Sequence, residues 1–165
     1  NFMKKNPDIQ FGDIFELEIA DNLFVYFQFI SKDLPLFNSD CIRFYKLIND
    51  SSSQIDLSDV TNSGTWFFSH TYIQTSLNKG EYRKIGHFAL PQNNELGSVS
   101  FHSDYDLNFP LRLRKIGQDF KSSIVEEAEY LSKLSSTWND TVMGPEAFKE
   151  RIRLKLLNPD YKFLY

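Results

Sequence analysis

The sequence predicts an α+β fold in which β-strands come first and two amphipathic helices come last. Apolar runs typical of strands recur from residue 11 to residue 117, and turn residues separate them at short intervals. Over residues 121–157 the apolar residues recur with the period of a helix. We therefore expect a single domain over residues 1–165. It would be a strongly bent antiparallel sheet or small barrel with two C-terminal helices packed on it.

A β-hairpin is predicted at the start of the chain. In residues 13–19 apolar side chains alternate with glutamates, which indicates one buried and one solvent-facing side. Residues 21–22, Asp-Asn, are a turn signal. Residues 23–30 are almost wholly apolar, as is typical of a strand covered on both faces.

Further strands are expected along the next ninety residues, with loops between them. The predicted strands span residues 41–48, 66–74, 82–90, 99–105 and 111–116. The predicted loops span residues 32–40 and 92–97, and a short helical turn is expected at residues 57–60.

The first of the two helices is predicted to start at Ser123. Ser123 and Glu126 have the spacing of a capping box, in which each side chain bonds the backbone amide of the other residue. The apolar face of this helix would include Ile124, Leu131 and Trp138.

The second helix is predicted to start at Pro145, since proline at the first helical position loses no needed hydrogen bond. Phe148, Ile152 and Leu156 would form its buried face, and Asn158 with the following proline would end it.

Composition and net charge narrow the range of functions expected for the chain. The chain has 165 residues, a net charge of −4 and a pI near 5.4, which argues against a nucleic acid as the main partner. The one cysteine, Cys41, excludes an intrachain disulfide and fits a reducing compartment. No apolar stretch is long enough to cross a bilayer and no signal peptide is visible. We expect a cytoplasmic protein.

The sequence carries no recognisable catalytic signature. The histidines His70, His87 and His102 lack the spacing of a metal motif, and Cys41 is expected to be a small buried residue rather than a nucleophile. We therefore expect no enzyme and no catalytic, cofactor-binding or metal-binding residue. An enzyme site assembled from His87, His102 and Glu16 is the alternative of lowest rank.

Aromatic residues are numerous enough to suggest a surface for another protein. Aromatic side chains carry much of the energy of protein interfaces, although a thick aromatic core is the favoured explanation of their number, because apolar residues mostly pack inside. The residues expected to bind a partner are Tyr26, Trp66, Phe68, Tyr82 and His87.

Residues 11–91 resemble the bacterial immunity protein 26 family. The resemblance rests on residues 11–17, Phe-Gly-Asp-Ile-Phe-Glu-Leu, on the turn and aromatic strand over residues 21–26, and on residues 82–91 around Ile85-Gly86. Departures are Phe27-Gln28, where a small residue is expected, and Tyr82, where tryptophan is common. The chain from residue 121 onward does not match the pattern.

The resemblance implies a protein that binds and neutralises a bacterial toxin by covering its active site, with a basic nuclease among the candidate toxins. An acidic inhibitor gains steered association with a basic target. The motif residues would serve the fold: Gly12 for backbone freedom, Phe15 for the core and Gly86 for a bulge or close approach.

An alternative function is a small-barrel nucleic-acid-binding or adaptor module. The cations that would contact phosphates are Arg83, Lys84, Arg112, Arg114 and Lys115.

Overall fold

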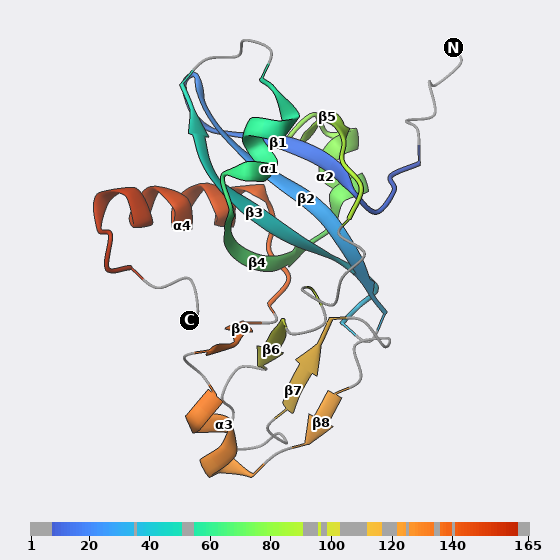
Figure 1. Cartoon of the computed structure of the whole chain (residues 1–165), viewed down its shortest axis with the longest axis vertical. Coiled ribbons are helices and arrows are strands. Elements are labelled where there is room, and N and C mark those ends of the chain that lie inside the picture. Colours follow the sequence, from blue (N-terminus) through green and yellow to red (C-terminus); the bar gives the residue numbers. More distant parts are fainter. Residues whose placement is uncertain are drawn as a thin grey trace.

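The structure is a computed structural model of the chain that describes most of its residues. The described residues are 8–34, 36–50, 55–90, 96, 99–102, 112–116, 122–124, 126–133, 136–139 and 141–161. They form two sheets and several helices, which confirms a mixed α+β fold (Figure 1).

The larger sheet has five antiparallel strands in the order β4-β3-β2-β1-β5. Its strands are β1 (Asp13–Ala20), β2 (Leu23–Asp33), β3 (Ser39–Asn49), β4 (Thr65–Thr71) and β5 (Arg83–His87). The predicted hairpin is confirmed as β1 and β2 joined at Asn22, which adopts a positive φ of 55°. In the described part of the chain β4 and β5 are opposite edges of an open sheet, so the small barrel is not formed.

Irregular pairing bends this sheet. A register shift interrupts each of the four strand pairings, and such bulges increase the local twist of a strand. At the shift between β1 and β5, Gly86 pairs with Ile14, and a Cβ on Gly86 would overlap the side chain of Leu57. The predicted role of Gly86 at a bulge with close approach is thereby confirmed.

The first face of the sheet holds an aromatic core. Phe27 is fully buried at its centre, and its ring lies 5.3 Å from Phe15, 5.2 Å from Phe44 and 4.8 Å from Tyr82. Helix α4 (Pro145–Leu157) and helix α2 (Ile73–Asn78) cover this face through Phe148, Ile152 and Ile73. The core position predicted for Phe15 is confirmed.

The second face is also covered, by two separate elements. Helix α1 (Leu57–Asn62) packs over Ile14, Tyr26 and Tyr45. The smaller sheet packs over Ile30 and Cys41 through Phe101 and Ile116. The expectation that one side of β1 faces solvent is therefore wrong for the first half of the strand, where Glu16 is only 6% exposed, and is confirmed at Glu18, which is exposed.

The smaller sheet replaces part of the predicted helical tail. Its strands are β6 (Ser100–His102), β7 (Arg112–Lys115), β8 (Ser122–Ile124) and β9 (Trp138–Asn139), in the order β8-β7-β6-β9 (Figure 1). The capping box predicted at Ser123 is wrong, because Ser123 lies in strand β8 and pairs with Leu113 of β7. Trp138 likewise lies in a strand rather than on a helix.

Two helices do occur in the C-terminal region, but only one of them packs as predicted. Helix α3 is limited to Glu127–Lys133, and its described side chains are exposed, so packing of this helix on the larger sheet is not confirmed. Helix α4 is confirmed, with Phe148 and Ile152 fully buried. The prediction for Leu156 is wrong, since it is 44% exposed. Eight helical positions rotate a side chain by about 80° from its starting direction, which turns Leu156 away from the sheet.

The remaining differences concern the ends of elements. The predicted loop at residues 32–40 is shorter, because β2 continues to Asp33 and β3 begins at Ser39. The strand predicted over residues 66–74 ends at Thr71, where α2 follows. Tyr105 lies outside the described residues. Of the helices in the described residues, none combines the length and hydropathy that a membrane span requires.

Helix α4 gives a direct test of the packing. Phe148→Ala should lower the free energy of unfolding by about 3–5 kcal/mol, because it removes a fully buried aromatic ring. Leu157→Ala on the same helix is the control, since Leu157 is 84% exposed, and should change stability by at most about 0.5 kcal/mol. Urea denaturation of both variants measures the difference, and equal effects would contradict the packing of α4.

Candidate functional site

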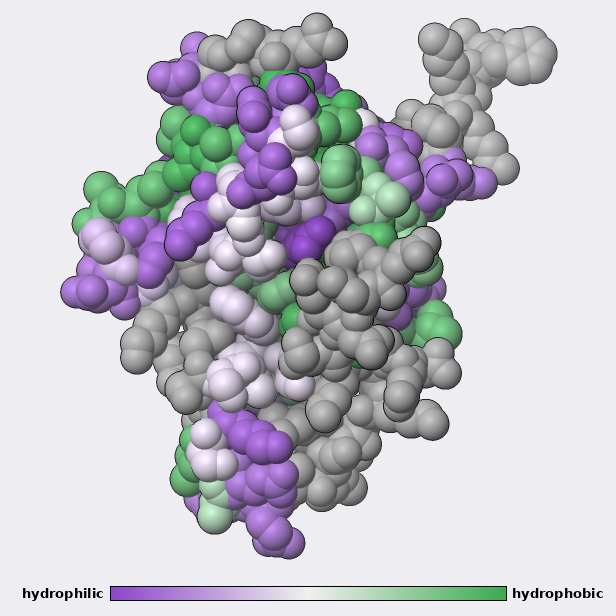
Figure 2. All heavy atoms as spheres, viewed as in Figure 1, coloured by the Kyte–Doolittle hydropathy of each residue, from purple (hydrophilic) through white to green (hydrophobic). Residues whose placement is uncertain are grey.

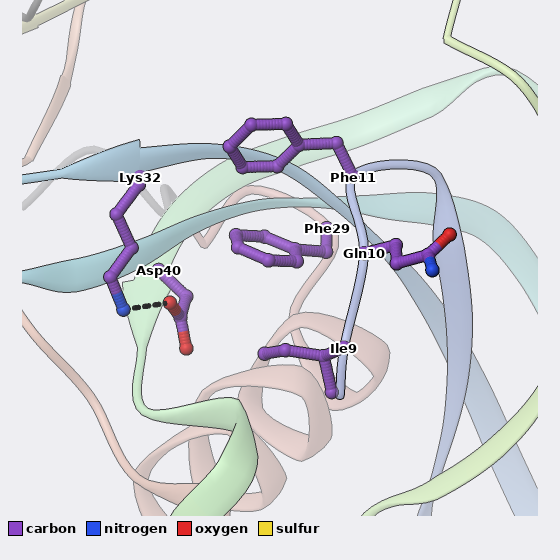
Figure 3. Close-up of a pocket in the computed structure, with 6 residues that line it drawn as sticks. All are labelled: Ile9, Gln10, Phe11, Phe29, Lys32 and Asp40. Carbon is purple, nitrogen blue, oxygen red and sulfur yellow. Dashed lines mark hydrogen bonds and ion pairs between the residues drawn. The ribbon is translucent and has the colours of Figure 1, made fainter. Parts of the chain in front are cut away.

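A largely apolar groove lies where the segment before β1 crosses β2. Its volume is about 460 Å³, and it is lined by Ile9, Gln10, Phe11, Phe29, Lys32 and Asp40. Figure 3 shows Phe11, Phe29 and Ile9 on one side of the groove and the Lys32–Asp40 pair on the other, with the Gln10 amide pointing away. Such a groove can receive an apolar side chain from a binding partner.

Glycine geometry and a buried amide position the aromatic side of this groove. Gly12 has a φ of 99°, and its N–H donates to the carbonyl of Phe29 at 2.8 Å. Gln28 holds the same turn, because its Nε2 donates to the carbonyls of Gly12 and Phe88. The Phe11 ring therefore meets the Phe29 ring edge-on, with centroids 4.9 Å apart. The predicted backbone freedom at Gly12 is confirmed, since a positive φ of this size favours glycine.

An ion pair forms the other side. Lys32 Nζ lies 2.7 Å from Asp40 Oδ1, and the second oxygen of Asp40 accepts the N–H of Ile73 at 2.8 Å. Asp40 thus joins β3 to the first residue of α2. The ammonium of Lys32 is the more exposed partner, so the polar rim of the groove presents a cation.

The tip of the β2–β3 hairpin adjoins this ion pair and exposes further apolar side chains. Phe37 is 78% exposed and Leu34 is 68% exposed. Tyr72 is also exposed, and its hydroxyl donates to the carbonyl of Phe37 at 2.9 Å. Figure 2 shows hydrophobic residues at the right-hand surface, where Figure 1 places the ends of β2 and β3. We call the groove residues together with Leu34, Phe37 and Tyr72 the docking surface.

The backbone of this tip is strained. Phe37 and the following Asn38 have φ values of 54° and 53°. The left-handed region costs a residue with a side chain on the order of 1–2 kcal/mol, and a bulky aromatic residue is rare there. The tip is held by Asp33, whose Oδ1 accepts the N–H of Leu36 at 3.2 Å, and Asp33 in turn forms a buried pair with His70 at 2.9 Å.

A buried carboxylate with two basic neighbours lies beside the groove. Asp13 Oδ1 is 2.9 Å from His87 Nδ1, and Asp13 Oδ2 is 3.0 Å from Lys84 Nζ and accepts the N–H of Gln10 at 2.8 Å. Burial acts to raise the pKa of Asp13, but the hydrogen bonds from Gln10, His87 and Lys84 outweigh it and hold that pKa below its usual value. This cluster fixes the start of β1 against β5.

The predicted partner-binding residues do not form one surface. Tyr26 and Tyr82 are buried in the core, and burial raises the pKa of both hydroxyls. Trp66 and Phe68 are half-buried, with Phe68 packed 5.9 Å from Trp138. The side chain of His87 is exposed beside Asp13. Tyr26 and Tyr82 therefore offer no contact area to a partner, because Tyr82 lies in the aromatic core and Tyr26 lies under α1.

The residues of the alternative enzyme site are separate in the structure. His87 pairs with Asp13, His102 Nδ1 lies 2.8 Å from Thr137 Oγ1, and Glu16 pairs with Arg83 at 2.7 Å. Within the described residues, no group of three or more histidine, cysteine or acidic side chains could hold a metal ion. Cys41 is fully buried, as predicted.

Two of the cations considered for phosphate contacts are engaged by carboxylates. Arg83 pairs with Glu16, and Lys84 pairs with Asp13. The side chains of Arg112, Arg114 and Lys115 lie outside what the structure describes.

Sequence reasoning missed Phe11, Leu34 and Phe37. A usable signal was present, because Leu34, Leu36 and Phe37 are apolar residues inside a stretch correctly recognised as containing a loop. Loops run over the surface of a protein, so apolar side chains in them are exposed unless another element covers them.

The Asp13 cluster predicts a specific pH dependence. A carboxyl group whose pKa is lower in the folded state stabilises the fold above its unfolded pKa, and this contribution is lost as the pH falls through the folded pKa. The stability difference between the wild type and Asp13→Asn should be largest near neutral pH and should shrink as the pH drops below 3.8, the ordinary value for this group.

Urea denaturation across this pH range measures the difference. Asp8→Asn is the control, because Asp8 is exposed at the same end of the described chain. A difference between the wild type and Asp13→Asn that does not change with pH would contradict the assigned role of the cluster.

The comparisons with known proteins leave the family resemblance a prediction. No protein-family model, no curated protein and no solved structure matches this chain.

Proposed function

We propose that this chain is a non-enzymatic binding protein that uses its docking surface to hold another protein. The observation that carries this proposal is the display of Phe37 on a strained backbone directly beside an apolar groove. Strain of this kind persists only where the surrounding structure fixes it, and it clusters at ligand clamps and binding sites.

The composition of the docking surface supports a protein as the partner. Aromatic anchors with a charged rim are typical of the residues that dominate protein interfaces. Phe11 and Phe37 supply exposed rings, and Lys32 supplies a cation at the rim of the groove. The groove can receive one apolar side chain of the partner while the hairpin tip inserts into the partner's own surface.

The resemblance of residues 11–91 to the immunity protein 26 family indicates which class of protein the partner belongs to. We propose that the partner is a bacterial toxin and that the chain neutralises it in the cytoplasm by covering its active site. The net charge of −4 supports faster association with a basic toxin such as a nuclease.

The test is co-expression with the product of the neighbouring gene, which the proposal predicts to be the toxin. Cells that carry both genes should grow, and purified proteins should form a complex measurable by calorimetry. Failure to protect cells and failure to bind that toxin would overturn the proposal.

A substitution at Phe37 separates binding from folding. Phe37→Asn should weaken toxin binding at least about tenfold, because exposed aromatic anchors contribute a disproportionate share of interface energy. The fold should be retained or stabilised, since asparagine tolerates a positive φ better than phenylalanine.

The matched control is Leu157→Asn, which replaces a highly exposed apolar residue on α4. It should bind the toxin as the wild type does. Equal binding by Phe37→Asn and the wild type would contradict the role of the hairpin tip.

A further inference from the structure

A transverse row of residues crosses all five strands of the larger sheet. Successive strand partners in this row are Gly86, Ile14, Gln28, Arg43 and Phe68. Gln28 and Arg43 lie on the second face, opposite the docking surface, because Phe29 next to Gln28 belongs to the first face. Along β3, Arg43 lies between Tyr45 and Cys41. Tyr45 belongs to the apolar cluster under α1, and Cys41 belongs to the apolar cluster under the smaller sheet.

The Gln28 amide is locked in one orientation. Its Nε2 donates to two carbonyl oxygens, so its Oε1 must be the atom that faces β3. This oxygen accepts Arg43 Nε at 3.0 Å, Arg43 Nη2 at 2.7 Å and the Tyr45 hydroxyl at 2.7 Å. The guanidinium also lies 5.1 Å from the centroid of the Tyr45 ring. Arg43 is therefore held in place by neutral groups.

Among the described residues, Arg43 has no carboxylate at ion-pair distance. Lys46 of the same strand also has none, but its side chain is exposed to water. Lys32, Arg83 and Lys84 each pair with an aspartate or glutamate within 3.0 Å. The side chain of Arg43 is nevertheless half-buried. A cation removed from water is ordinarily paired, since desolvation without compensation is costly.

The N–H groups of Arg43 that do not bond Gln28 lie along one edge of the guanidinium, and this edge is available to a ligand. A guanidinium has five N–H groups in a planar fork, and the bonds to Gln28 use Nε and one N–H of Nη2. The Nη1 edge has no acceptor among the described residues. Burial raises the pKa of Tyr45, so its hydroxyl stays protonated near neutral pH and does not supply a counter-charge.

We propose that Arg43 is the receptor of a second binding site, for a small organic monocarboxylate. The Nη1 and Nη2 donors match a carboxylate in a bidentate pair, and one negative charge balances the single cation. Phe68, the cross-strand neighbour of Arg43, is half-buried and favours a ligand with an apolar body over a fully hydrated anion. This site is independent of the proposed toxin-binding function.

The test uses benzoate as the probe and the Nε–Hε signal of Arg43 in ¹⁵N NMR spectra of the full chain. Titration with sodium benzoate should shift this signal to saturation. Sodium chloride at equal ionic strength should leave it unchanged. A shift that grows without saturation, or an equal shift in chloride, would overturn the proposal.

Two variants and a second anion test whether benzoate binds at Arg43 and whether the site prefers a carboxylate. Arg43→Lys should bind benzoate at least about tenfold more weakly, because a lysine keeps the charge but lacks the planar fork. Arg83→Gln is the matched control and should bind benzoate as the wild type does, because Arg83 is already paired. Saturation by inorganic phosphate without saturation by benzoate would refute the carboxylate specificity.

Discussion

The hydrogen bonds of one buried amide, that of Gln28, hold together the part of the sheet on which both proposed sites depend. Gln28 lies on β2, and its side chain reaches the turn before β1, the end of β5 and two residues of β3. A fully buried amide is costly unless all its polar atoms are satisfied, and here both the oxygen and the nitrogen are used. The same bonds place the segment that forms the groove on one face and fix Arg43 on the other.

Coverage of the sheet on both faces explains where exposed apolar residues can occur. The aromatic core, α1 and the smaller sheet enclose most side chains of β2 and β3. Apart from leucines on α3 and α4, the large exposed apolar residues among those described therefore lie beyond the ends of strands, as Phe11 does before β1 and Phe37 does between β2 and β3. A binding surface at strand ends keeps the core rigid while loops supply the contacts.

Sequence patterns were sufficient for the elements with strong local signals. The β1–β2 hairpin and α4 follow from continuous apolar runs, a turn dipeptide and a proline start. The short strands β8 and β9 did not follow, because strands of this length carry little periodicity and their pairing is decided by distant residues. Ser123 shows this directly, since strand pairing with Leu113 overrides a local capping signal. The site residues could not be identified from the sequence, because their exposure depends on contacts between distant strands. These contacts bury Tyr26 and Tyr82 in the core and leave Phe37 exposed.

Hydrogen exchange of the complex with the proposed toxin partner tests the central claim, that the docking surface is where the partner binds. The account predicts that toxin slows amide exchange in residues 8–12, 36–40 and 72–73, which carry the groove and the hairpin tip, and leaves α4 unchanged. Protection confined to α4 or to the smaller sheet, in a complex that forms, would contradict it.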